Sequence, residues 1–476
     1  MDDVVIVGAG PSGLTAAHEV AHHGARTTVI EQLDQVGGLS RTTEYCGSRF
    51  DIGAHRFFTK NVEINDLFTR VLGAELVRVP RLSRILHDGK YFDYPLTPVN
   101  AAFGIGLREG IAIAGSYAAA RLRAALAPRP IDSFEDWIID RFGDRLYQHF
   151  FKTYTEKVWG ISCQRISADW ASQRIRGLSL TAALRNAVRK SKDNNIKTLV
   201  DEFAYPRLGA GQTYELMAET VKQRGNDVLT SSAVQNIRRD GMRVRAIVVK
   251  CADGRKIEVE GKYFLVSAPL TDMVNMMEPL PPANVLQASH ALRYREHIGV
   301  NLLIEGHPFA DNWIYVHDKN VAMARIANYR SFSLDMAGRA DVSPMTIEYF
   351  VFPGDELSLS SDNTLIERAK MELLQVGLIG RDQVIDGFVV RSPKAYPVIE
   401  IGHKKHVDTI KMWLDRFENL LPIGRSGMFK YNNQDHAMAT GLLAARAALG
   451  FERFDPWLVN IDAEYHETGP SRPVKG

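Results

Sequence analysis

The first 31 residues follow a pattern of apolar runs and a helical segment in the order strand, turn, helix, strand. An apolar run reaches residue 7, a glycine-rich turn follows it, and the helical segment after the turn leads to a second apolar run that ends at Glu31. Short apolar runs joined by an amphipathic segment are typical of a βαβ unit. We therefore expect the chain to begin with a Rossmann-type α/β unit.

The glycine-rich turn carries the first chemical signal. Gly8, Gly10 and Gly13 form a G-x-G-x-x-G loop: the first glycine permits a tight turn, the second lets the backbone approach a pyrophosphate, and the third lets the helix pack closely on the strand. The phosphates then lie at a helix N-terminus, which favours anions. Glu31 is placed to accept a hydrogen bond from a ribose 2′-hydroxyl. Together these features predict dinucleotide binding, with a glycine turn in a plain α/β domain as the alternative.

The residues after Glu31 indicate which dinucleotide is expected. Gly37 and Gly38 form a second glycine pair, and the basic Arg41 follows. This arrangement suits a longer cofactor and resembles FAD-binding oxidoreductases of the amine oxidase and glutathione reductase type. Residues 420–449 indicate a strand, a glycine loop and a long amphipathic helix, whose N-terminus in that class faces the flavin pyrimidine ring.

The remaining pattern divides the chain into three parts. Apolar residues recur at helical spacing after the expected N-cap Ser133, whereas residues 285–415 alternate as in the strands of an antiparallel sheet. The predicted fold is α/β, a discontinuous Rossmann-type FAD-binding domain with a helical insert and an antiparallel-sheet insert. The predicted boundaries are 1–75, 196–284 and 416–466 for the FAD-binding domain, 76–195 for a mainly helical nucleotide-binding insert, 285–415 for an antiparallel-sheet substrate domain, and 467–476 for a flexible tail.

Composition narrows the function classes. The 476 residues are 45% hydrophobic and 24% charged, and the net charge of +2 gives no reason to expect nucleic acid or a membrane surface as partner. The widely spaced Cys46, Cys163 and Cys251 predict neither a metal site nor disulfides. The apolar stretch 101–127 is interrupted by charges, which indicates amphipathic helices and no membrane span. A cytoplasmic location is expected, since the first apolar run leads into the glycine loop and not into a signal-peptide cleavage site.

Four segments, in chain order, carry a more specific resemblance. FDIGAHRFFT (50–59), YTEKVWG (154–160), LRYREH (292–297) and GRSGMFKYNNQD (424–435) are similar to motifs of UDP-galactopyranose mutase, a flavoprotein family within the wider FAD-dependent amine oxidase and protoporphyrinogen oxidase-like superfamily. The resemblance implies an FAD whose reduced form is active, with NADH or NADPH as the external reductant. It implies interconversion of the pyranose and furanose forms of a nucleoside-diphosphate hexose through an adduct of the sugar with flavin N5, without net redox change.

The resemblance also implies roles for individual residues. Arg174 and Arg295 would clamp the diphosphate, and Tyr431 and, less directly, Tyr315 would touch the phosphates. His55 would lie near the isoalloxazine ring. Four further residues complete the implied substrate-binding set. Phe150 and Tyr154 would sandwich the base, Trp159 would line the sugar pocket, and Asn433 would orient the sugar. The implied cofactor contacts are Gly8, Gly10, Ser12, Gly13, Glu31, Gly38, Leu39, Arg41, His55, Val234, Arg425 and Gln434.

Each of these roles has a structural alternative. Tyr154 and Trp159 could pack a domain interface, the arginines could form surface ion pairs, and His55 could be a hydrogen-bonded core residue. Phe58 and Asn433 stand where the mutase motifs have a histidine and an aspartate, so neither sugar nor nucleotide is fixed. The alternative functions are an FAD-dependent oxidase or desaturase of an apolar substrate and a non-enzymatic binding module. The sequence leaves an oligomer possible.

Overall fold

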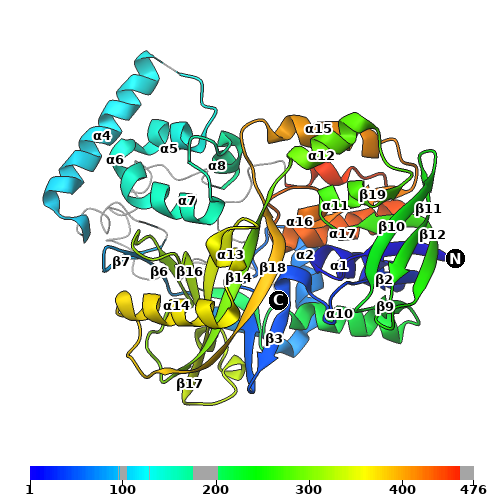
Figure 1. Cartoon of the computed structure of the whole chain (residues 1–476), viewed down its shortest axis with the longest axis horizontal. Helices are drawn as coiled ribbons and strands as arrows, with labels where there is room; N and C mark the ends of the chain where they lie inside the picture. Colours follow the sequence, from blue (N-terminus) through cyan, green and yellow to red (C-terminus); the bar gives the residue numbers. More distant parts are fainter. Residues whose placement is uncertain (95, 97–103, 128, 175–201, 461–476) are drawn as a thin grey trace.

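The computed structural model describes residues 1–94, 96, 104–127, 129–174 and 202–460. The described residues form two large sheets, two small two-stranded sheets and a group of helices (Figure 1). The predicted mixed α/β fold is confirmed. The expected tail at 467–476 and all of residues 175–201 lie outside the described residues. Among the described residues, no helix is long and apolar enough to cross a membrane.

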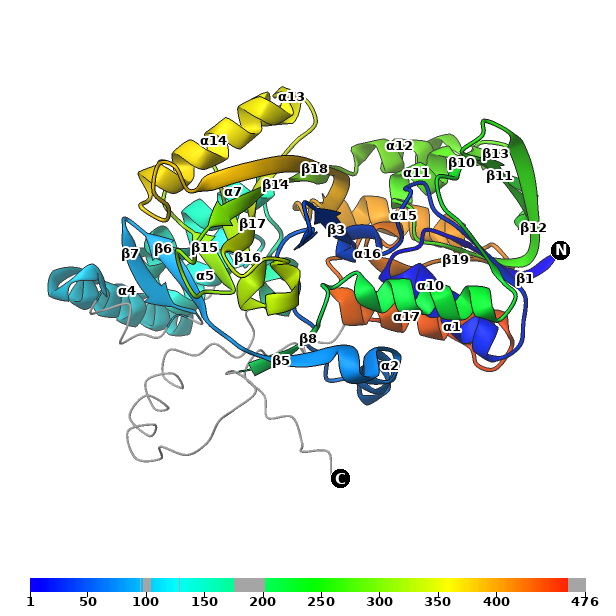
Figure 2. The same ribbon diagram turned by 90° about the horizontal axis from the view of Figure 1, so that it is seen from below.

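The first sheet contains the N-terminal βαβ unit. Strand β1 (Asp2–Val7) pairs in parallel with β2 (Thr27–Ile30) and with β12 (Lys256–Val266), and the sheet order is β13-β10-β11-β12-β1-β2-β9, with β19 also on β12. The other bounds are β9 Asp227–Leu229, β10 Ala233–Asp240, β11 Arg243–Lys250, β13 Met277–Glu278 and β19 Leu420–Pro422. Helices α1 (Pro11–His22), α10 (Gln212–Gln223) and α17 (Gln434–Ala448) lie together against this sheet (Figure 2).

The second sheet is mostly antiparallel and has the order β18-β14-β17-β16-β15-β6-β7. Strand β17 is buried along its whole length and β14 at all but two of its positions, which explains the apolar runs of this region. Its bounds are β6 Ser83–His87, β7 Lys90–Asp93, β14 Tyr294–Glu305, β15 Trp313–Val316, β16 Arg325–Asn328, β17 Val342–Val351 and β18 Val384–Pro397. Helix α14 (Asp362–Gln375) packs against β14 and β18 and contributes to an apolar cluster with this sheet.

The prediction of mainly helical structure from residue 76 onward is wrong for residues 76–93. Strand β5 (Leu76–Pro80) pairs with β8 (Glu202–Pro206), and β6 and β7 form a hairpin on the edge of the second sheet. Asp88 and Gly89 connect β6 and β7 with positive φ angles of 48° and 70°. An Asp-Gly pair is a strong hairpin signal because a two-residue hairpin turn of the common type requires positive φ at both positions.

Helices α4–α8 form the group beside the second sheet. Their bounds are α4 Leu107–Leu126, α5 Phe134–Phe142, α6 Asp144–Tyr147, α7 Thr153–Trp159 and α8 Ala168–Arg174, with a π-helical turn at Gln148–Lys152. Ser133 caps α5 as predicted, since its Oγ accepts a hydrogen bond from the Asp136 backbone N–H at 3.0 Å. The buried faces are aromatic and belong to the largest apolar cluster of the described chain.

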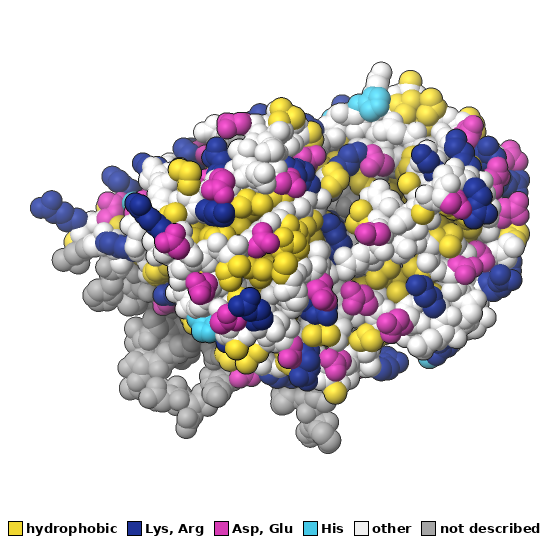
Figure 3. Space-filling model, turned by 60° about the horizontal axis from the view of Figure 1, so that its bottom comes forward, with side chains coloured by type: hydrophobic (Ala, Val, Ile, Leu, Met, Phe, Trp, Pro, Cys, Tyr) yellow, Lys and Arg dark blue, Asp and Glu magenta, His cyan; other side chains and the backbone are white. Residues whose placement is uncertain are grey.

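The shorter elements complete the described chain. They are β3 Thr42–Tyr45, β4 Ser48–Asp51, α2 Val62–Leu72, α11 Leu270–Asn275, α12 Ala283–Ala291, α13 Glu356–Leu359, α15 His403–Leu414 and α16 Gly424–Gly427. On the face that Figure 3 presents, Lys and Arg are interspersed with Asp and Glu. The small net charge is therefore not concentrated as a basic field on that face.

Two glycines set the close approach of α1 to its neighbours. A Cβ on Gly13 would lie 1.8 Å from the Gly8 carbonyl oxygen, and a Cβ on Gly441 in α17 would lie 2.0 Å from the Ser12 carbonyl oxygen. Both contacts involve backbone, which cannot rotate away as a side chain can. Helix α1 therefore sits between β1 and α17 at a distance that only glycine permits.

We expect Gly441→Ala to lower the free energy of unfolding by about 1–3 kcal/mol, because the added methyl group forces α17 away from α1. The matched control is Gly115→Ala in α4, where a Cβ meets nothing within 4 Å. Alanine is the better helix former, so this control should be neutral or stabilising by up to about 1 kcal/mol. Urea unfolding followed by circular dichroism measures both. Equal effects of the two substitutions would contradict the packing argument.

Candidate functional site

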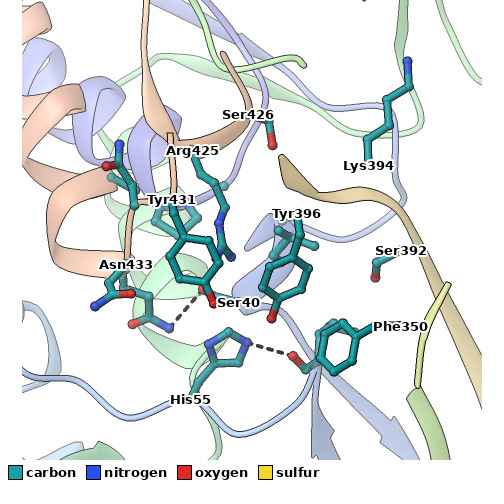
Figure 4. Close-up of a pocket in the computed structure, with 18 of the residues that line it drawn as sticks. Ser40, His55, Phe350, Ser392, Lys394, Tyr396, Arg425, Ser426, Tyr431 and Asn433 are labelled. Carbon is teal, nitrogen blue, oxygen red and sulfur yellow. Dashed lines mark hydrogen bonds between the residues drawn. The ribbon is translucent and has the colours of Figure 1, made fainter. Parts of the chain in front are cut away.

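A cavity of about 1100 Å³ lies where the first sheet, the second sheet and the helical group meet. The glycine loop and Glu31 line one end of the cavity, and the aromatic residues of α5–α8 line the other end. Residues far apart in the sequence therefore form one continuous site, and Figure 4 shows the part in which His55, Tyr396, Arg425 and Tyr431 converge.

The glycine loop has the geometry that a dinucleotide requires. Gly8 has φ +94°, and a Cβ on Gly38 would lie 3.0 Å from the Gly10 Cα, so the two glycine loops touch. The Glu31 carboxylate is buried at the end of β2, where it accepts hydrogen bonds from the Ala9 N–H at 2.8 Å and the Leu33 N–H at 2.9 Å. These bonds fix the carboxylate at the cavity wall.

The other predicted cofactor contacts also line the cavity, except Gly13, which packs behind the loop. They are Ser12, Leu39, Arg41, Val234, Arg425 and Gln434. Arg41 donates to the Gly38 carbonyl at 2.9 Å, and Gln434 donates to Ser40 Oγ at 3.0 Å. Among the described residues, Arg425 Nε and a carboxylate oxygen of Asp435 are buried without a hydrogen-bond partner. Unpaired polar atoms and a glycine loop that a dinucleotide can approach closely fit FAD, which would offer hydrogen-bond partners to Arg425 Nε and to the Asp435 oxygen.

His55 lies on the loop after β4, beside the region where the flavin ring would sit. Its Nε2 lies 2.9 Å from the Ile52 carbonyl oxygen (Figure 4), so that nitrogen carries the proton in this bond. Removal from water, together with the nearby guanidinium of Arg325, lowers the pKa of His55 to about 4, against the opposing effect of Glu348. The imidazole is therefore neutral at physiological pH.

Arg425 projects between two tyrosine rings. Its Cζ lies 4.5 Å from the ring centroid of Tyr396 and 4.4 Å from that of Tyr431. Within the described part of the chain no carboxylate lies within ion-pair distance of it. The aromatic faces hold the cation in place without neutralising its charge, which leaves it available to an anion in the cavity.

Arg325 on β16 is the second cavity-lining arginine near this cluster, and it is paired. Its Nε and Nη2 donate to the two oxygens of Glu348 at 2.6 and 2.5 Å. The Glu348 carboxylate is fully buried and lies 3.0 Å from His297 Nε2. Burial opposes ionisation of Glu348, but Arg325 and His297 outweigh it and hold the pKa of this carboxyl well below its usual range.

Arg295 is not in the cavity lining, contrary to its predicted role in the diphosphate clamp. Its guanidinium is only 4% exposed, donates to the backbone carbonyls of Lys157 and Phe350, and lies beneath the Phe352 ring at 4.6 Å. It therefore donates hydrogen bonds to a backbone carbonyl in the last turn of α7 and to one near the end of β17. Arg295 thus holds these two elements together. Arg174 ends helix α8, and its side chain lies outside what the structure describes.

The predicted aromatic residues line the cavity, but not as a sandwich of Phe150 and Tyr154. Phe150 packs edge-on against Phe92, whereas Tyr154 stacks on His317 at 4.7 Å with an interplanar angle of 10°. Phe150 lies in the π-helical turn between α6 and α7, whereas Tyr154 lies in the first turn of α7. Tyr315 meets the Tyr154 ring edge at 5.5 Å.

Two further predicted substrate residues also border the cavity. Trp159 is 1% exposed and packs edge-on against Trp170 and beside Tyr431, at 5.0 and 5.8 Å between ring centroids. Asn433 is the N-cap of α17, so the first turn of this helix faces the cavity. A helix N-terminus at this position favours negative charge nearby.

Comparison with known proteins agrees with this geometry. Residues 11–389 match the family of flavin containing amine oxidoreductases. The reduced UDP-galactopyranose mutase crystal structure superposes with a TM-score of 0.82 at 21% identity and covers 97% of this chain and 99% of that one. A sequence relative, the "Probable UDP-galactopyranose mutase" of Klebsiella pneumoniae, is 26% identical over 180 residues, which are 35% of this chain and 43% of that protein. Coproporphyrinogen III oxidase of Mycobacterium tuberculosis is 25% identical over 437 residues, 86% of this chain and 90% of that protein.

The chain belongs to the flavin containing amine oxidoreductase family and is an FAD-dependent enzyme of that superfamily. The expected resemblance to UDP-galactopyranose mutase within this superfamily is confirmed for the fold.

Sequence reasoning missed three residues of the central cluster: Arg325, Glu348 and Tyr396. Each lies on a strand of the second sheet, where an alternating pattern indicates a face but not which polar residue meets the cofactor. The available signal was a single acidic residue, Glu348, within the mostly apolar strand β17, because a buried acid requires a partner.

We expect the His55→Gln variant to lose less stability than the parent protein as pH falls from about 6.5 to 4. Over this window the unfolded chain binds a proton at position 55 and the folded protein does not, so acid stabilises the unfolded state. Above pH 6.5 His55 is neutral in both states, so its full contribution to the free energy of unfolding is present. Near pH 4 the loss of stability in the parent protein should exceed that in the variant by on the order of 1–3 kcal/mol. Urea titrations of both proteins at several pH values measure it. Parallel stability curves would show that the pKa of His55 is the same in the folded and the unfolded state.

Proposed function

We propose that this chain is a flavin-dependent mutase that interconverts the pyranose and furanose forms of a nucleoside-diphosphate hexose. The observation that carries the proposal is the group of Arg325, Tyr396, Arg425 and Tyr431 on the cavity wall beside His55. Guanidinium groups and phenols are suited to diphosphate oxygens because they donate several hydrogen bonds in fixed directions. Reduced FAD, when bound, supplies a nucleophile for the anomeric carbon.

In this proposal each wall of the cavity has a separate task. Arg325, held by Glu348, and the phenols of Tyr396 and Tyr431 stabilise charge that develops on the departing diphosphate. The Tyr154 ring offers a stacking surface for the base, worth about 1–3 kcal/mol. Asn433 can donate to and accept from a sugar hydroxyl without carrying charge.

A second candidate function is oxidation of an apolar substrate, and the far end of the cavity favours it. That wall consists of aliphatic and aromatic side chains: Ile85, Leu96, Phe134, Phe142, Leu146, Phe150 and Phe151. A wall without hydrogen-bond donors suits an apolar ring system better than a nucleotide base. The relative with the longest alignment described above is an oxidase of a porphyrinogen.

The two functions are separated by reducing the bound flavin with dithionite under anaerobic conditions and adding UDP-, GDP- and dTDP-hexopyranoses in turn. We expect a product of unchanged mass and changed retention by liquid chromatography and mass spectrometry, formed by the reduced protein and not by the oxidised one. If the reduced protein leaves every sugar nucleotide unchanged and the oxidised protein consumes O2 with a porphyrinogen or an amine, the oxidase function replaces the mutase. Bleaching of the flavin by NADH or NADPH tests the proposed reductants.

Arg325 and Arg295 provide a matched pair of variants. Arg325→Lys keeps a positive charge beside Glu348 but loses the bidentate hydrogen bonding of the guanidinium. We expect kcat/KM to fall by about 10²-fold while the flavin stays bound. Arg295→Lys should leave kcat/KM within about threefold and lower the free energy of unfolding by about 1–3 kcal/mol, because it caps α7 and does not touch substrate. Steady-state kinetics and urea unfolding measure both. The reverse pattern would return Arg295 to the diphosphate site.

A further inference from the structure

Helix α4 covers the outer side of the helical group, at the end of the molecule opposite the first sheet (Figures 1 and 2). One side of the helix packs on α5 and α6 and carries the buried residues Ile113 and Ala120. The opposite side faces solvent. A helix in this position normally presents polar residues outward.

The solvent side of α4 is apolar instead. Ile111, Leu122 and Leu126 have exposed fractions of 66%, 61% and 75%, and the exposed Ala114 and Ala118 lie between them. At 3.6 residues per turn these positions fall on one face, opposite Ile113 and Ala120. The helix is therefore apolar on both sides, although only one side is covered by the described residues.

Arginines border this exposed apolar stripe. Arg121 falls on one flank, Arg108 and Arg123 fall on the other, and all three are exposed. The one acidic residue in the α4 sequence, Glu109, lies toward the buried side, where its carboxylate is 3.4 Å from Arg145 and 3.2 Å from His149. The exposed side of α4 is thus apolar at its centre and positive at its edges.

We propose that α4 docks the protein on the surface of a bilayer that contains anionic phospholipid. The three large apolar side chains would enter the interface between headgroups, while the flexible arginine side chains reach lipid phosphates on either side. The helix lies in the membrane plane and does not cross the bilayer, in accord with the absence of a sufficiently apolar span in the described chain.

The charges favour lipid over a second copy of the chain as the occupant of this face. Two α4 helices packed face to face would bring Arg108, Arg121 and Arg123 of both copies together, and the described helix α4 carries no acid on that side to pair with them. Like charges at a contact oppose association, whereas an anionic surface neutralises them.

Docking through α4 would place the substrate cavity next to the bilayer. Helices α5 and α6, on which α4 packs, contribute Phe134, Phe142 and Leu146 to the cavity wall. The inference rests on the surface of α4 alone and holds whichever reaction the cavity catalyses.

The test is flotation of the full-length, flavin-loaded protein with phosphatidylcholine vesicles that contain or lack phosphatidylglycerol. We expect binding to the anionic vesicles that weakens with added salt. Leu122→Glu should reduce this binding about tenfold or more, since it removes a large apolar contact and adds repulsion. Arg121→Gln and Arg123→Gln should each reduce it about fivefold. Leu359→Glu on α13 is the matched control, because Leu359 is 76% exposed and away from α4, and it should bind as the parent does.

Flavin absorbance and unfolding temperature confirm that each variant is folded, and light scattering after size exclusion gives its oligomeric state. Failure of the parent protein to float with anionic vesicles would overturn the proposal. Equal loss in Leu122→Glu and Leu359→Glu would also overturn it. A dimer that Leu122→Glu converts to a monomer, without vesicle binding, would assign the α4 surface to a second copy of the chain.

Discussion

The active-site region depends on one buried carboxylate. Glu348 is fully excluded from solvent in β17, and it is held by Arg325 from β16 and by His297 from β14. Its carboxylate also lies against the loop before His55. A Cβ on Gly53 would lie only 2.6 Å from one Glu348 oxygen, so this close contact requires a glycine. A buried charge is strongly destabilising unless it is paired, so three strands and the loop must assemble together around it.

This constraint connects the two halves of the site. The loop of His55 leaves the small β3–β4 sheet near the FAD-binding domain, while Arg325 belongs to the second sheet. Because the same carboxylate contacts both, the Arg325 guanidinium has a fixed position relative to the loop of His55. Positioning of this kind, and not the intrinsic reactivity of a side chain, is what a cofactor-dependent enzyme requires from its protein.

The cavity combines two chemical environments. Near His55 it offers a half-buried arginine between two tyrosine rings, and near α5–α7 it offers aromatic walls with few donors. The first environment suits a diphosphate and the second suits a flat or apolar group. The chain is similar in fold to a mutase and in sequence to a coproporphyrinogen oxidase, so similarity alone does not select one chemistry.

Local pattern was sufficient for the N-terminal unit but not for the central cluster. The positions of Gly8, Gly10, Gly13 and Glu31 followed from spacing, because all four lie within one βαβ unit whose geometry is nearly invariant. The hairpin at Asp88 had an equally local signal that the helical interpretation of its surroundings overlooked.

The sequence by itself determined the class of fold, the cofactor cradle and the aromatic character of the substrate side. Only the tertiary structure decided that Arg325 and not Arg295 faces the cavity, although both arginines begin or lie near the start of a strand in the same sheet. A strand places successive side chains on opposite faces, so register and strand order decide which arginine meets the cofactor. The register and the strand order are set by pairings between distant residues, such as Arg295 with Tyr396 and Trp313 with Ser83, which no local pattern records.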